Sequence, residues 1–360
     1  MLRILRAVNN FADYSRWGAW LLDQPAPGPH PTHRMHTTTP IEESTRAEEQ
    51  VAAAVLTGLR SLPRQLPPWL FYDEAGSRLF EEITELPEYY LTRTERGILA
   101  AHAGAMVERA ADGMRLRIAE LGAGSADKSR LLLKAAVERQ GTAVYEPIDV
   151  SASALDAARE RIEREIAGIT VAPRVMDYTH GLELEAAGHD ERRLVLYIGS
   201  SIGNFDPHEA LALLRRVRAG LKAGDGLLLG VDLVKDEAKL LAAYDDAAGV
   251  TARFNLNMLA RLNRELGADF NPAAFRHRAV WNGMESRIEM HLESVCPQRV
   301  RVAALDFEVD FAEGETIHTE NSYKYTAALA EQMIATAGFA VVGNWTDERR
   351  WFGVWLGRVE

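Results

Sequence analysis

Five short apolar runs follow one another between residues 116 and 233, and segments with helical spacing separate most of them. The runs are Leu116–Leu121, Ala143–Ile148, Ile169–Met176, Arg193–Ile198 and Gly226–Leu233. Strands and helices that alternate in this way form a parallel sheet with helices on both of its faces. We therefore predict an α/β domain with a doubly wound sheet in this part of the chain.

The alternation stops after Lys235. Residues 238–266 have helical spacing, whereas residues 276–309 alternate apolar and polar side chains. An alternation with a period of two is typical of strands in an antiparallel sheet. We therefore predict a separate module with a long helical stretch and an antiparallel meander, and we expect the segment before Tyr90 to join it.

The end of the chain returns to the earlier pattern. Residues 326–337 are predicted to form a helix, and residues 339–345 and 351–358 a hairpin on the parallel sheet. The module is therefore expected to be an insertion near the end of the α/β domain. The predicted division gives an extension, disordered or upstream of the true start, at residues 1–40, a core at 90–235 and 325–360, and an inserted α+β domain at 41–89 and 236–324.

The composition argues against several classes of protein. The formal net charge is −11, and a surface this acidic disfavours nucleic acids and anionic membranes as partners, because both attract clustered Lys and Arg. No apolar run reaches the roughly 20 residues of a membrane helix. The single cysteine, Cys296, cannot form an internal disulfide, and no Cys/His cluster has zinc spacing. We expect a cytoplasmic monomer without a bound metal.

Two glycines follow the first apolar run, in the sequence Glu120-Leu-Gly-Ala-Gly. Ligands of doubly wound sheets bind at the carboxyl ends of the strands, and a glycine there lets a ligand approach the backbone. Gly122 and Gly124 alone are a weak sign, since many such pairs are turn glycines. Asp149 and Asp177 end the second and third runs, where they can bind ribose hydroxyls and an adenine amino group. Together these residues predict a nucleotide-like cofactor.

The same loop separates two kinds of cofactor. A dinucleotide usually requires Gly-x-Gly-x-x-Gly, but Gly122–Asp127 has no third glycine. S-adenosylmethionine has no pyrophosphate and so needs a bare helix N-terminus less, which favours this methyl donor. Lys128 lies just beyond the loop and can pair with the donor's carboxylate, although a solvated helix lysine is the ordinary alternative.

Several long strings in the sequence resemble a known family. They are Leu70–Thr84, Leu86–Glu95, Tyr197–Asn204, Gly230–Asp236 and Tyr244–Thr251. With these strings the chain is similar to the histidine-specific N-alpha-methyltransferases of ergothioneine biosynthesis, from about residue 61 to the C-terminus. The resemblance implies a Rossmann-like class I methyltransferase core that uses S-adenosylmethionine as co-substrate, and a second domain that recognises histidine. The implied activity methylates the α-amino group of L-histidine three times, which gives hercynine.

The resemblance also assigns residues to two sites. Donor contacts are implied for Tyr89, Gly122, Lys128, Asp149, Asp177 and Tyr178. Acceptor contacts are implied for Asn204 and Tyr244 with the substrate carboxylate, and for Tyr72, Glu320 and Ser322 with the imidazole, with Met290 lining the same pocket. Asn321 stands where an apolar residue is more usual, but on a strand it would face away from its neighbours. Tyr72 has two open roles, as proton acceptor for the amine or as a hydrogen-bond anchor.

Three alternatives remain open at this point. The first is a methyltransferase for another amino acid or amine, which loss of the Glu320/Ser322 pair would have favoured. The second is a non-catalytic protein that binds S-adenosylmethionine or histidine, which an intact donor loop beside an intact acceptor set argues against. The third is a nucleotide-dependent oxidoreductase, which the missing third glycine disfavours. Without the resemblance, Glu320 would be read as a surface carboxylate.

Overall fold

The computed structural model describes residues 40–179, 181, 182, 184 and 188–360. The described chain divides into two compact units, one of residues 91–234 and 323–360 and the other of residues 40–90 and 235–322. The predicted extension at residues 1–40 lies almost wholly outside the described residues. No helix in the described ranges has the length and apolar character that crossing a membrane requires.

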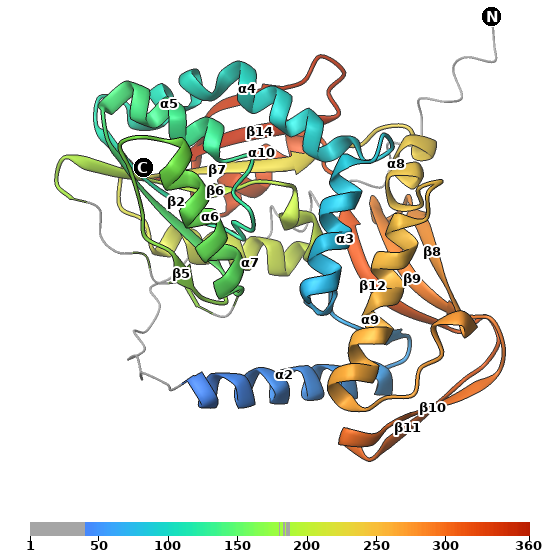
Figure 1. Ribbon diagram of the computed structural model, residues 1–360. Coiled ribbons are helices and arrows are strands. Elements are labelled where there is room, and N and C mark those ends of the chain that lie inside the picture. The colour runs from blue at the N-terminus through green and yellow to red at the C-terminus, as the bar shows by residue number, and fades with distance from the viewer. Residues whose placement is uncertain (1–39, 180, 183, 185–187) are drawn as a thin grey trace, which may run out of the picture. The chain divides into compact units, whose positions relative to one another are not determined.

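A sheet in the order β13-β14-β7-β6-β2-β3-β4 forms the centre of the first unit, and β5 also pairs with β3 (Figure 1). Its strands are β2 (Arg115–Leu121), β3 (Ala143–Asp149), β4 (Ile169–Val171), β5 (Arg174–Val175), β6 (Glu191–Tyr197), β7 (Gly226–Asp232), β13 (Ala340–Thr346) and β14 (Phe352–Arg358). The pairs among β2 to β7 are parallel, whereas β14 is antiparallel to both β7 and β13. The predicted parallel sheet with a terminal hairpin is confirmed.

The third apolar run differs from the prediction, because it forms two short strands instead of one. β4 ends at Val171 and β5 begins at Arg174, and both pair with β3. Pro173 lies between them and has no N–H to donate to the sheet. The ladder is therefore interrupted there and resumes one residue later.

Helices cover both faces of this sheet. They are α4 (Tyr90–Ala111), α5 (Arg130–Gln140), α6 (Ala152–Glu165), α7 (Pro207–Ala219) and α10 (Ala327–Thr336). Side chains of α4, α5 and α6 share one buried apolar cluster with the sheet, and those of α7 and α10 share another. The starts of two helices follow from local sequence. Ser151 caps α6, and Asp206 and Glu209 form a capping box at α7 with Pro207 in its first turn.

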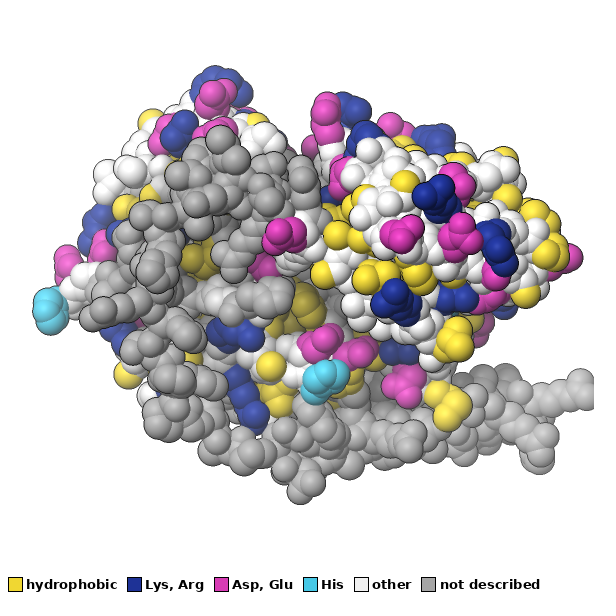
Figure 2. Space-filling view, turned by 90° about the horizontal axis from the view of Figure 1, so that it is seen from below, with side chains coloured by type: hydrophobic (Ala, Val, Ile, Leu, Met, Phe, Trp, Pro, Cys, Tyr) yellow, Lys and Arg dark blue, Asp and Glu magenta, His cyan; other side chains and the backbone are white. Residues whose placement is uncertain are grey.

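The second unit contains a sheet in the order β1-β12-β9-β8 and a separate pair, β10-β11. The strands are β1 (Arg64–Gln65), β8 (Phe275–Asn282), β9 (Arg287–Ser294), β10 (Gln298–Val302), β11 (Phe307–Phe311) and β12 (Thr316–Tyr323). The single meander predicted for residues 276–309 is wrong beyond β9, because β12 takes the place beside β9. Figure 2 shows acidic and basic side chains interspersed over the face that it displays.

The helices of the second unit are α2 (Pro40–Arg60), α3 (Glu74–Glu85), α8 (Glu237–Tyr244) and α9 (Val250–Leu266). The continuous helical stretch predicted for residues 238–266 is therefore broken. Asp246 accepts hydrogen bonds from the backbone N–H groups of Val250 and Thr251, and Gly249 has a φ of +69°. A side chain that satisfies a new helix start, next to a left-handed glycine, ends one helix and begins another.

Candidate functional site

A glycine turn follows β2 in the first unit. Gly122 and Gly124 have φ values of +65° and +48°, which L side chains rarely adopt. A Cβ on Gly122 would also lie 3.2 Å from the hydroxyl oxygen of Tyr178. The turn therefore favours glycine at both positions, and the space that a Cβ of Gly124 would occupy is open, which leaves room for a ligand to approach the main chain there.

Asp149, the last residue of β3, is tied to this turn. Its Oδ2 accepts from the N–H of Gly124 at 3.1 Å, and its Oδ1 accepts from the N–H of Ser151 at 3.0 Å. Asp177 is oriented in a similar way, since its Oδ1 accepts from the N–H and the hydroxyl of Thr179 at 2.9 and 2.5 Å. A carboxylate has about four lone-pair positions, and these two bonds of Asp149 use one on each of its oxygens.

Tyr178 lies between the turn and the core. Its ring packs edge-on against Tyr197, with ring centroids 5.9 Å apart. Burial raises the pKa of Tyr178 to about 12, so the hydroxyl keeps its proton at neutral pH. The structure thus brings Gly122, Asp149 and Tyr178 together, with Asp177 next to Tyr178 in the chain.

Lys128 forms an ion pair that sequence reasoning missed. Its Nζ lies 2.5 Å from Oε2 of Glu95, a fully buried carboxylate on α4, and the Lys128 side chain is 22% exposed. The solvated-lysine alternative therefore does not describe Lys128. Only a weak signal in the sequence pointed to this pair: Glu95 is the last residue of the string Leu86–Glu95, and no role was assigned to it.

Glu120, the first residue of the glycine motif, also forms a buried side-chain contact. Its side chain is buried and accepts a hydrogen bond from the hydroxyl of Tyr145 on β3. Burial raises the pKa of Glu120 to about 7, and the hydrogen bond from Tyr145 opposes this effect. A titratable pair thus lies directly behind the glycine turn.

In the second unit, three of the predicted residues contact one another. The rings of Tyr89 and Tyr244 pack edge-on with centroids 6.3 Å apart, and the hydroxyl oxygens of Tyr244 and Ser322 are 2.7 Å apart. Tyr89 was assigned to the donor and Tyr244 and Ser322 to opposite ends of the acceptor. The direct bond between the two hydroxyls was not foreseen.

The remaining acceptor residues are distributed over both units. Met290 on β9 and Glu320 on β12 are buried in the second unit. Asn204 lies in the first unit, at the end of the short helix η3 (Ser201–Asn204). Asn321 is half-buried, and its Oδ1 lies 2.9 Å from Nε2 of His318.

His277 on β8 holds the main chain of Tyr244. Its Nε2 lies 2.8 Å from the carbonyl oxygen of Tyr244, and its Nδ1 lies 2.9 Å from Nδ2 of Asn255. A carbonyl oxygen only accepts, so the ring proton resides on Nε2 and Nδ1 accepts from the amide. Burial lowers the pKa of His277, which favours this neutral ring.

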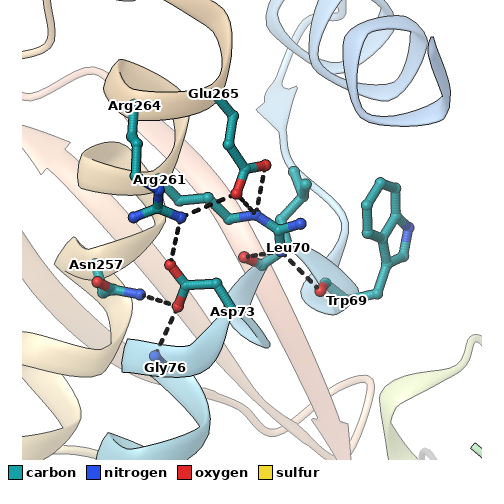
Figure 3. Close-up of polar contacts among 8 residues, drawn as sticks. All are labelled: Trp69, Leu70, Asp73, Gly76, Asn257, Arg261, Arg264 and Glu265. Carbon is teal, nitrogen blue, oxygen red and sulfur yellow. Dashed lines mark hydrogen bonds and ion pairs between the residues drawn. The ribbon is translucent and has the colours of Figure 1, made fainter. Parts of the chain in front are cut away.

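Tyr72 is 44% exposed, and its ring packs edge-on against Phe80 and Phe254. The next residue, Asp73, fixes this segment to two helices (Figure 3). Asp73 Oδ1 caps α3 by accepting from the N–H of Gly76 at 2.7 Å, and it also accepts from Asn257 of α9 at 2.8 Å.

Two arginines of α9 complete this attachment. Oδ2 of Asp73 accepts from Arg264 at 2.7 Å, and Arg261 donates to the carbonyl oxygen of Leu70 at 2.9 Å. The chain on both sides of Tyr72 is therefore held by α9, through the carbonyl oxygen of Leu70 and the side chain of Asp73, which Figure 3 draws. Sequence reasoning missed Asp73, although it stood in the string Leu70–Thr84 at an N-cap position.

Within the described ranges, no group of three or more His, Cys, Asp or Glu side chains is arranged to hold a metal ion. Comparison with known proteins concerns the chain as a whole. A family model described as histidine-specific methyltransferase, SAM-dependent, matches residues 51–359. The histidine N-alpha-methyltransferase of Mycobacterium tuberculosis is 45% identical over 303 residues, which cover 84% of this chain and 92% of that protein.

Two further relatives show the same similarity. The histidine N-alpha-methyltransferase of Mycolicibacterium smegmatis is 44% identical over 310 residues, covering 86% of this chain and 95% of that protein. Ergothioneine biosynthesis protein 1 of Neurospora crassa is 34% identical over 295 residues, covering 79% of this chain but 32% of that protein. The similarity thus includes both described units.

Proposed function

The chain belongs to the family of SAM-dependent histidine-specific methyltransferases, and we propose that it transfers methyl groups to the α-amino nitrogen of L-histidine. Three transfers give hercynine, the first step of ergothioneine biosynthesis. S-adenosylmethionine is the co-substrate. The observation that carries the proposal is 45% identity to a histidine N-alpha-methyltransferase over 84% of the chain.

The geometry of the first unit fits the methyl donor. The bare turn at Gly122 and Gly124 accommodates close approach to the backbone, and the oriented carboxylate of Asp149 suits ribose hydroxyls. Tyr178 and Asp177 line the same strand ends, where nucleotide ligands of such sheets bind. We assign donor binding to these residues, to Lys128 and to Tyr89.

The second unit supplies the groups that would recognise the imidazole. A neutral imidazole has one N–H and one bare ring nitrogen, so it needs one acceptor and one donor. Glu320 provides the acceptor and Ser322 the hydroxyl. An amino acid without those nitrogens would leave both groups unpaired, which penalises it strongly. We therefore assign residues 41–89 and 236–324 to substrate binding.

The bond between Tyr244 and Ser322 refines these assignments. The two hydroxyls carry two protons, and the bond between them uses one. While that bond persists, the pair can donate at most one further hydrogen bond, from Ser322 or from Tyr244. We propose that Tyr244 donates to Ser322 and Ser322 to the bare ring nitrogen, and that Asn204 holds the carboxylate.

The chemistry is an in-line displacement, in which an N–C bond forms as the C–S bond of the sulfonium breaks. Positioning of the amine therefore dominates the rate. The substrate ammonium must lose one proton before the first transfer, and each of the first two products must lose one more. The third transfer leaves a quaternary nitrogen with no proton to lose. Tyr72 is assigned to the imidazole as a hydrogen-bond anchor or, as the other open role, to the amine as its proton acceptor.

One assay tests the proposal. The protein is incubated with labelled S-adenosylmethionine and each of the standard amino acids in turn, and the masses of the products are measured by mass spectrometry. We expect histidine alone to gain one, two and then three methyl groups. Methylation of a different amino acid would identify that amino acid as the substrate. Binding of S-adenosylmethionine and histidine without any mass gain would establish a non-catalytic protein.

A further inference from the structure

Glu95 lies in the first unit and has no role in the proposed function so far. It lies on α4, and its side chain is fully buried. Its two oxygens have different partners: Oε2 lies 2.5 Å from Nζ of Lys128, and Oε1 accepts from the N–H of Gly199 at 2.8 Å. One carboxylate therefore joins Lys128, which follows the donor turn, to Gly199, which lies two residues after β6.

Two glycines make room for this arrangement. A Cβ on Gly199 would lie 2.8 Å from Nζ of Lys128, and a Cβ on Gly230 would lie 2.3 Å from Oε1 of Glu95. At distances that short the neighbouring atom must shift, so a side chain at either position would displace a member of the ion pair. The backbone of β7 and the turn after β6 thus fit closely around the two charged groups.

The contacts explain how a buried carboxylate is tolerated. Burial of an unpaired charge is costly, and Glu95 is compensated by a charged partner and a backbone donor. An ammonium has three N–H groups, so Lys128 retains donors for a ligand while it contacts Glu95. Gly199 also begins the segment that carries Asn204. A displaced Glu95 would therefore disturb a donor contact and an acceptor contact together.

We propose that Glu95 is a positioning residue, which fixes the ammonium of Lys128 for the carboxylate of the methyl donor and anchors the segment of residues 199–204. This inference rests on the proposed function and deepens it. Glu95 acts through Lys128 and Gly199 and does not itself touch substrate. Its effect is therefore expected to be selective for ligands that carry the amino-acid portion of the donor.

The experiment compares two ligands. S-adenosylhomocysteine carries the amino-acid portion, whereas 5′-methylthioadenosine has the same adenosine and sulfur without it. Dissociation constants are measured by calorimetry for the wild type, Glu95→Gln, Lys128→Met and the double variant. The matched control is Glu108→Gln, which removes a carboxylate from the same helix and from an exposed ion pair with Arg139.

A glutamine has one carbonyl oxygen, so it can satisfy only one of the two partners of Glu95. We expect Glu95→Gln and Lys128→Met each to weaken S-adenosylhomocysteine binding about 10- to 100-fold, the range for a charge-assisted hydrogen bond. Binding of 5′-methylthioadenosine should change less than about twofold. The double variant should match Lys128→Met alone, because both changes remove one coupled contact. Glu108→Gln should bind both ligands as the wild type does.

Three results would overturn the inference. If Glu95→Gln and the shorter Glu95→Asp each weakened the binding of S-adenosylhomocysteine and of 5′-methylthioadenosine by the same factor, Glu95 would have a purely structural role. Tighter binding of S-adenosylhomocysteine would show that its charge merely repels the ligand. Additive losses in the double variant would separate Glu95 from Lys128. None of these readouts involves histidine, so failure of the wild type to methylate histidine would refute the proposed function alone.

Discussion

Asp73 allows the attachment of the Tyr72 segment to be measured. Asp73→Asn keeps Oδ1, which accepts from Gly76 and Asn257, and replaces Oδ2, the charged acceptor of Arg264, by an amide nitrogen that cannot accept. Asp73→Ala removes all three contacts. The two variants therefore separate the helix cap from the ion pair.

The expected losses differ in size. The Arg264 side chain is 54% exposed, and an exposed ion pair contributes about 0.2–1 kcal/mol. The cap contributes roughly 0.5–2 kcal/mol, and the hydrogen bond from Asn257 about 0.5–1.5 kcal/mol. We expect Asp73→Asn to lower the free energy of unfolding by about 0.5 kcal/mol and Asp73→Ala by about 2–3 kcal/mol.

Urea unfolding at pH 7, followed by circular dichroism, measures both losses, and the Michaelis constant for histidine reports on Tyr72. The control is Glu74→Ala, which removes the exposed neighbouring carboxylate that pairs with Arg78. It should cost no more than about 0.5 kcal/mol. Equal losses for Asp73→Asn and Asp73→Ala would refute the reasoning, because the ion pair alone would then hold the segment.

The difference in stability between wild type and Asp73→Asn should depend on pH. Burial by itself would raise the pKa of Asp73, but the Gly76 N–H and the Arg264 and Asn257 side chains outweigh it and hold the pKa below its usual value. The stability that this charge contributes is complete above the unfolded pKa of about 3.9 and is lost as the pH falls through the folded pKa. The difference between wild type and Asp73→Asn should therefore be constant from about pH 5 to 7 and close below about pH 4.

Three further outcomes follow from single side chains. Glu320→Ala should raise the Michaelis constant for histidine at least about tenfold with little change for the methyl donor, and a near-unchanged value would remove Glu320 from the imidazole site. Tyr72→Phe should lower turnover between about pH 7 and 9 if the hydroxyl accepts a proton, and an unchanged profile would leave it the anchoring role. Glu120→Gln should become more stable relative to wild type as the pH rises through about 7. The raised pKa means that the protonated carboxyl stabilises the folded wild type, and this stabilisation is lost as the pH rises through about 7. The same difference in urea midpoint between the two proteins at pH 6 and at pH 8 would contradict this prediction.

The fold was accessible from the sequence wherever burial leaves a repeating pattern. Apolar runs marked the parallel strands and the terminal hairpin, because strands of a sheet covered by helices bury both faces. The pattern did not show that Pro173 would divide the third run, nor that Asp246 would start a second helix. Those breaks depend on single backbone donors and acceptors, to which periodicity is insensitive.

The site was accessible only in part. Gly122 and Asp149 follow from strand ends, which a sequence locates well. Glu95 with Lys128, and Tyr145 with Glu120, are separated by 33 and 25 residues and meet only when helices and strands pack. Tertiary contacts of this kind have no local signature. The assignments of Glu320, Ser322 and Met290 came from resemblance and stay predictions.

The order of the strands also bears on how the chain is made. β14, the last strand, pairs with β7, and β12 lies between β1 and β9 in the other unit. On the ribosome, the edge of β7 stays open until nearly the whole chain has emerged, and the second unit waits for residues 316–323. Unpaired edges of this kind invite association with other chains. The second unit therefore cannot complete its sheet before β12 has been made, and the first unit cannot complete its sheet before β14, which is made later still.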